Sequence, residues 1–178
     1  MSFTGFRLCI TSADALLALA LAVSVYCSPV VAANDTIEIT VRVRDEAAIP
    51  KRIRMLAEKE AGSILEKAGV HVVWVDCVRP APDSWYCPGG GPLTFGLWMQ
   101  VAAPARVHSN CLGFAFIGAS GEPHATIIYS RILGAAHDTG VDSSSVLGVA
   151  IAHELGHLLL QSTEHGTDLM APAGDFMS

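Results

Sequence analysis

The residues with the clearest chemical potential are two histidines and a glutamate in the segment His153-Glu154-Leu155-Gly156-His157. Residues four apart on a helix lie on one face, so both imidazoles can reach a single metal ion. Glu154 is offset by one position, which suits a base that holds a water molecule without binding the metal. The flanking residues, Val149 to Ala152 and Leu158 to Leu160, are apolar and indicate a buried helix, in which two unpaired histidines would be costly. The pattern therefore predicts a zinc site with Glu154 as its catalytic base.

A catalytic zinc ion usually has three protein ligands and an open position for water. The chain ends soon after His157, and the remaining candidates for the third ligand are His165, Glu164, Asp168 and Asp175. Residues 161–164 can end the helix and turn the chain back, and the flexible Gly166 follows His165. His165 is therefore well placed to complete a set of three histidines, and Glu164 is the alternative ligand.

The scaffold for this site begins with a strand, because Thr36 to Arg44 alternates between apolar and polar residues. Pro50 suits the first turn of a helix that continues to about residue 68, and Gly69 ends it. A second strand, His71 to Val75, follows. The two strands of such a strand-helix-strand unit should be parallel.

The later part of the chain predicts further strands and the helix that carries the motif. Prolines and glycines make residues 77–92 an irregular loop. Asp142 or Ser143 can cap the motif helix, which runs from about residue 144 to 160. Three more strands are predicted at residues 93–101, 112–117 and 125–129, with a turn at 118–123. The predicted fold class is α+β: a mixed, mostly parallel, twisted sheet of four to five strands, with one helix behind it and the zinc-binding helix below it.

The N-terminus carries a targeting pattern. Arg7 precedes an apolar run from Ala15 to Tyr26, and Val31-Ala32-Ala33 offers small residues for signal peptidase. Residues 1–33 are therefore predicted to be a signal peptide, with a retained N-terminal anchor as the alternative, and residues 34–178 a single domain. No later segment is predicted to be long and apolar enough to cross a bilayer, so stable membrane insertion after cleavage is not expected. The protein is predicted to be secreted or periplasmic.

The net charge bears on whether the protein binds nucleic acid, and the cysteines bear on disulfide formation. The formal net charge is −6 at pH 7 and no basic run is visible, which argues against nucleic acid. In an exported chain, Cys77 and Cys87 are the natural disulfide pair, closing a short loop. Cys111 is then a buried free thiol or a partner for either of the others.

Together with the downstream His165 and the turn Gly166-Thr167-Asp168-Leu169-Met170, the motif resembles the metzincin clan of zinc peptidases. In that clan a third histidine follows the helix, and a methionine in a tight turn lies beneath the metal. The resemblance implies zinc on His153, His157 and His165, with Met170 as the floor of the site. It also implies a mixed sheet whose antiparallel edge strand, here Leu112 to Ile117, pairs with an extended peptide; a buried sheet strand is the other interpretation of that segment.

The chain departs from the clan pattern at two positions. The clan has a glycine three residues after the second histidine and a ligand three residues further on, where this chain has Leu160 and Thr163. Its histidine, His165, arrives two residues late. The segment Ala152 to Met170 more closely resembles a group of small, largely uncharacterised secreted bacterial proteins, which share the Leu-Leu-Leu run and a histidine eight residues after the second ligand.

These patterns predict a secreted zinc-dependent endopeptidase, a hydrolase that acts on peptide or protein substrates. Glu154 is expected to take a proton from the attacking water and pass it to the leaving amine. The alternative is an exported zinc- or peptide-binding module without efficient catalysis. The remaining histidines have no ligand spacing and are predicted to be surface or strand residues: His71, His108, His124 and His137.

Overall fold

The computed structural model describes residues 36–105, 107, 111–117 and 122–161 of the chain. All of them belong to one unit, Asp35–Ser178. The predicted signal peptide lies outside the described residues. So do the candidate third ligands and Met170.

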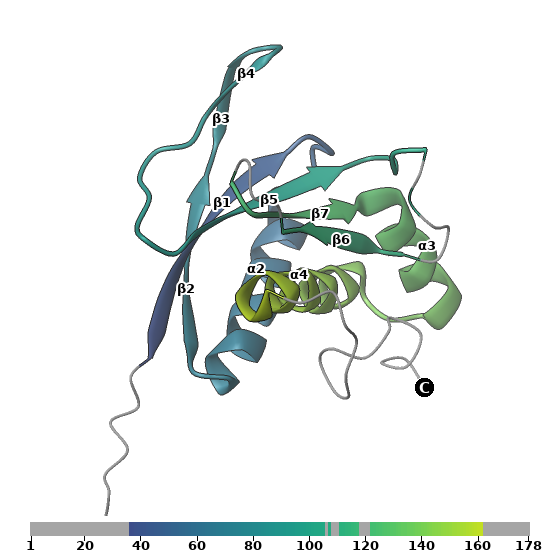
Figure 1. Ribbon diagram of the computed structural model, residues 1–178. Coiled ribbons are helices and arrows are strands. Elements are labelled where there is room, and N and C mark those ends of the chain that lie inside the picture. The colour runs from purple at the N-terminus through teal and green to yellow at the C-terminus, as the bar shows by residue number, and fades with distance from the viewer. Residues whose placement is uncertain (1–35, 106, 108–110, 118–121, 162–178) are drawn as a thin grey trace, which may run out of the picture. The chain divides into compact units, whose positions relative to one another are not determined.

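The described residues form a five-stranded sheet, a separate two-stranded sheet and three helices (Figure 1). The main sheet has the order β2-β1-β5-β7-β6 and is parallel except for the antiparallel pair of β6 and β7. This confirms the predicted α+β class with a mixed, mostly parallel sheet. Its strands are β1 (Ile37–Asp45), β2 (Val70–Asp76), β5 (Thr94–Gln100), β6 (Gly113–Phe116) and β7 (His124–Ile128). The helices are α2 (Lys51–Lys67), α3 (Tyr129–Thr139) and α4 (Ser143–Leu160).

The core lies between one face of the sheet and the two long helices. Alternate residues of β1, namely Ile39, Val41 and Val43, are buried on this face, as their spacing in the sequence predicts. Helices α2 and α4 both lie beneath this face, where they pack against each other (Figure 1). The predicted arrangement, with one helix behind the sheet and the other below it, is therefore replaced by two helices on the same side.

Two elements differ from the sequence-based expectation. Residues 77–92 were predicted to be an irregular loop, but they contain an antiparallel hairpin of β3 (Val78–Ala81) and β4 (Ser84–Tyr86), which projects from the main sheet (Figure 1). The predicted disulfide between Cys77 and Cys87 is present and holds the base of this hairpin together. It brings the two segments side by side although prolines interrupt their strand pattern. Helix α3 was not predicted, and Ile132 is its one buried residue.

Helix α4 is 18 residues long and has a mean hydropathy of 1.2, so it could cross a bilayer by length and composition alone. The expectation that no segment after the signal peptide has this length and composition was therefore wrong. In the structure 72% of α4 is buried. Its apolar character is explained by contacts with the sheet and with α2 rather than with lipid.

A close helix crossing positions the motif helix. Gly148 of α4 lies against α2, and a Cβ at this position would be 2.7 Å from Glu60 Cβ and 2.9 Å from the Ala57 backbone oxygen. Real Cβ atoms do not approach other atoms this closely. Gly148 is therefore the residue that lets α4 approach α2.

We expect Gly148→Ala to lower the free energy of unfolding by about 1–3 kcal/mol, because the two helices must move apart. Gly134 provides the matched control, since it is an exposed glycine of α3 whose Cβ would meet nothing within 4 Å. Gly134→Ala should stabilise the protein by about 0.5–1 kcal/mol through helix propensity. Urea denaturation of both variants measures the difference; equal effects of the two substitutions would contradict the tight crossing.

Candidate metal centre on helix α4 and strand β6

The N-terminus of α4 is capped as the sequence predicts. The Asp142 carboxylate accepts a hydrogen bond from the Ser144 backbone N–H at 2.9 Å. The Ser144 hydroxyl and its N–H hold the pKa of Asp142 below its ordinary value. The helix then continues without interruption to Leu160 and ends at Gln161, which has a left-handed conformation with φ 49°. One regular helix therefore carries the whole motif.

The two motif histidines point toward each other across one turn of this helix. Their Nε2 atoms are 3.1 Å apart, and the rings are perpendicular with centroids 4.7 Å apart. Both residues are buried, with 8% of His153 and 5% of His157 exposed. A tetrahedral zinc ion with bonds of about 2.0–2.1 Å holds two nitrogen ligands roughly 3.3 Å apart. The observed separation thus fits two imidazoles on one zinc ion.

Glu154 lies beside these histidines, at the contact between α4 and the start of β6. It is 7% exposed, and burial raises the pKa of its carboxyl to about 7. A Cβ at Gly113 would be 3.0 Å from Glu154 Cγ and 2.7 Å from the Thr126 backbone oxygen. The absence of a side chain at Gly113 therefore lets β6 lie this close to Glu154 Cγ. A base with a pKa near 7 is suited to proton transfer at neutral pH.

Strand β6 is an edge strand, because it pairs with β7 on one side and no described strand pairs with its other side. The segment that precedes β6 is held by Arg131 of α3. Arg131 donates hydrogen bonds to the Cys111 carbonyl at 2.6 Å and to the Val107 carbonyl at 3.4 Å. Arg131 thus holds the segment that enters the edge strand, and Gly113 at the start of β6 lies close to the Glu154 side chain. Sequence patterns did not identify Arg131, because its role depends on the packing of α3 beside the segment that enters β6.

The described residues bring together two of the three predicted metal ligands. His165 and the alternatives Glu164, Asp168 and Asp175 lie outside the described residues. Within the described part of the chain, no group of three or more His, Cys, Asp or Glu side chains is arranged to hold a metal ion. Cys111 is a free, half-buried thiol. The two-histidine pair and the buried glutamate are therefore the part of the site that the structure defines.

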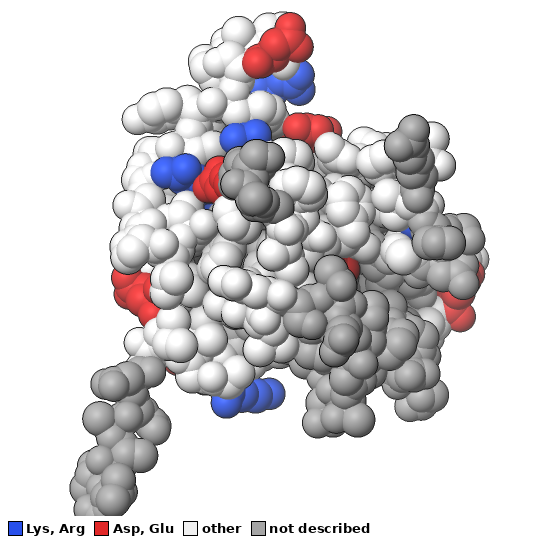
Figure 2. All heavy atoms as spheres, in the orientation of Figure 1, with Lys and Arg blue, Asp and Glu red and all other residues white. Residues whose placement is uncertain are grey.

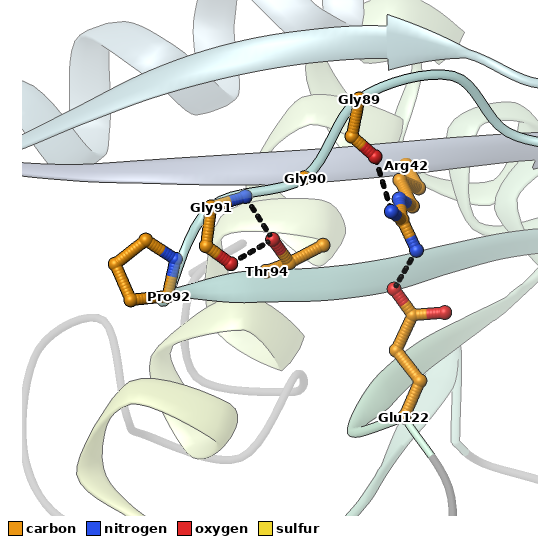
Figure 3. A pocket seen from close by; sticks show the side chains of 7 residues that line it. All are labelled: Arg42, Gly89, Gly90, Gly91, Pro92, Thr94 and Glu122. Atoms are coloured by element: carbon orange, nitrogen blue, oxygen red, sulfur yellow. Dashed lines mark hydrogen bonds and ion pairs between the residues drawn. The ribbon is translucent and has the colours of Figure 1, made fainter.

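A separate hollow of about 590 Å³ lies on the face of the sheet away from α4 (Figure 3). Its walls are the glycine run at residues 89–91 with Pro92, and Arg42, Thr94 and Glu122 complete the lining. Arg42 donates to the Gly89 carbonyl and pairs with Glu122 at 3.2 Å, while Thr94 exchanges hydrogen bonds with Gly91 at 2.7 and 2.8 Å. Arg42 Nε is buried and has no hydrogen-bond partner among the described residues. The other polar groups bond to one another, so we assign no ligand to the hollow.

Comparison with known protein families, with curated proteins and with solved structures finds no match for this chain. The metzincin resemblance therefore remains a prediction based on the motif and its spacing.

Proposed function

We propose that this chain is a zinc-dependent endopeptidase whose active site lies between α4 and β6. The observation that carries the proposal is the buried pair of imidazoles, with Nε2 atoms 3.1 Å apart and a buried glutamate beside them. A purely structural zinc site has no need for a glutamate at this position. The combination of two ligands and a neighbouring base is what metal-assisted hydrolysis requires.

In this proposal His153 and His157 hold the zinc ion, with His165 as the third ligand and Glu164 as the alternative. Zinc, when bound, lowers the pKa of a water molecule and polarises the carbonyl of the bond to be cleaved. Glu154 accepts a proton from the attacking water and passes it to the leaving amine. The Glu154 side chain is buried and lies beside Gly113 of β6.

Substrate recognition in this proposal uses the outer edge of β6, with which no described strand pairs. An extended peptide can add to this edge through main-chain hydrogen bonds. The peptide residue opposite Gly113 would then lie next to Glu154, since β6 contacts that side chain at Gly113. The Cys77–Cys87 disulfide agrees with an exported protein, whether secreted or periplasmic.

The second candidate function is an exported zinc- or peptide-binding module without efficient catalysis. The shortness of β6, which has four residues, favours this alternative. The two candidates share the metal and the edge strand and differ in turnover, so a cleavage assay separates them.

Metal removal tests the proposed function. Dialysis against a zinc chelator should abolish cleavage of a mixed peptide library by the purified protein, and stoichiometric zinc should restore it, because the reaction needs the metal to activate water. Cleavage sites are read by mass spectrometry. Cleavage that continues in the zinc-free protein would contradict the proposal, and zinc binding without any cleavage would favour the binding module.

The third ligand has its own test. We expect His165→Ala to weaken zinc binding about 100-fold, since each ligand supplies a share of the binding free energy. Glu164→Gln is the matched variant and should leave zinc affinity near that of the wild type. Competition with a fluorescent chelator measures both. The reverse result would assign the third position to Glu164.

A further inference from the structure

Four side chains from four neighbouring strands stack across the face of the sheet that the helices do not cover. Arg44 of β1 lies over Trp98 of β5, with its Cζ atom 5.2 Å from the ring centroid. Trp98 stacks on His124 of β7 at 3.6 Å between centroids, and His124 stacks on Phe116 of β6 at 5.2 Å. We call these four residues the stacking ladder. The sheet order runs β1-β5-β7-β6 here, and each of these four strands contributes one member.

The register of the strands explains why the ladder forms. Arg44 is the register partner of Trp98, and Phe116 is the register partner of His124. The partner of His124 on β5 is Gly96, and a Cβ there would be 2.9 Å from His124 Cβ and 3.2 Å from Trp98 Nε1. Because Gly96 has no side chain, the Trp98 ring can lean over it and reach His124. The strand register and the space above Gly96 therefore bring the four side chains together.

The ladder ends at the edge of the sheet that β6 forms among the described strands. Phe116 stacks on His124 toward β7, and 44% of the residue remains exposed. Cross-strand neighbours on one face have their Cβ atoms about 4.5–5.5 Å apart. A peptide strand added to β6 would therefore place one of its side chains against Phe116, as the next member of the ladder.

We propose that Phe116 is a specificity-determining residue that selects an aromatic side chain in the peptide bound along β6. This inference rests on the proposed function, because it takes the free edge of β6 as the substrate site. The inner ladder members are planar rings in stacked contact, and an aromatic side chain continues this geometry. Figure 2 shows the charged side chains of this view as small separate groups of both signs among uncharged residues.

The position of the selected residue follows from strand geometry. Phe116 lies three residues after Gly113, which is about 10 Å along an extended strand. Gly113 faces Glu154 and Phe116 faces the opposite side of the sheet. The aromatic residue of the substrate should thus lie about three residues from the residue opposite Gly113, with its side chain turned away from the metal.

A set of peptides of equal length tests this proposal. Each peptide carries phenylalanine at one position of a small-residue background, and parallel sets carry leucine, arginine or alanine. With the wild-type protein, phenylalanine at one position about three residues from the cleaved bond should raise kcat/KM about 2–10-fold over alanine. Phe116→Ala should reduce this ratio to near one. Tyr86→Ala, at an exposed aromatic residue of β4, is the control and should leave the ratio unchanged.

A preference that survives in Phe116→Ala, or an equal or larger gain from arginine or leucine, would overturn the proposal. A binding assay tests the preference for an aromatic side chain independently of the proposed catalysis. Labelled phenylalanine and alanine peptides are titrated onto the Glu154→Gln protein and followed by fluorescence anisotropy. Tighter binding of the phenylalanine peptide that depends on Phe116 supports the inference even if no peptide is cleaved. Equal binding of the two peptides contradicts it, including where β6 instead pairs with a second copy of the chain.

Discussion

Replacing Glu154 by glutamine should lower kcat about 10²–10⁴-fold while the protein keeps its zinc, because the glutamine amide cannot accept the proton from the attacking water. Glutamine has nearly the same shape as glutamate and does not carry the desolvation penalty that raises the pKa of Glu154 to about 7. The variant should therefore fold and bind peptide normally. Steady-state cleavage and metal analysis of the same preparation give both quantities.

The control for this variant is Glu66→Gln, at an exposed position of α2. It makes the same substitution at an exposed side chain that is not part of the proposed site and should leave turnover and zinc content unchanged. Unchanged turnover in Glu154→Gln would show that Glu154 is not the base. Loss of zinc in the same variant would indicate that Glu154 holds the metal, contrary to its offset from the two histidines.

Replacing either His153 or His157 by alanine should weaken zinc binding by about 100-fold or more and abolish cleavage with it. Their Nε2 atoms face each other at 3.1 Å inside the protein, so both variants should lose the metal to a similar extent. Zinc affinity is measured by competition with a chelator, and circular dichroism checks that each variant is folded.

His137→Ala provides the matched control, because His137 is an exposed histidine of α3. It should retain zinc and activity. A folded His153→Ala or His157→Ala protein that binds zinc as tightly as the wild type would refute the assignment of these two residues as ligands.

Local periodicity predicted the parts of this fold that depend on single elements. The four-residue spacing of His153 and His157 correctly placed both on one face of a helix, and Asp142 correctly marked its cap. The alternation of β1 correctly gave its buried face. These features follow from helix and strand geometry alone, so the sequence contains them directly.

The remaining features depend on which segments meet, and local patterns do not contain that information. The β3–β4 hairpin forms where prolines predicted a loop, because Cys77 and Cys87 fix the two segments at the base. The contact between Gly113 and Glu154 requires β6 to lie over α4. The stacking ladder requires the strand order β1-β5-β7-β6, which places residues from distant parts of the chain next to one another.

The most direct test of the central claim is the position of zinc in crystals of the zinc-loaded protein, measured by anomalous diffraction at the zinc absorption edge. We expect one peak per chain, about 2.0–2.1 Å from Nε2 of both His153 and His157, with the Glu154 carboxylate nearby but outside bonding distance. A zinc peak elsewhere, no peak at the two histidines, or a Glu154 oxygen in place of an imidazole would contradict it.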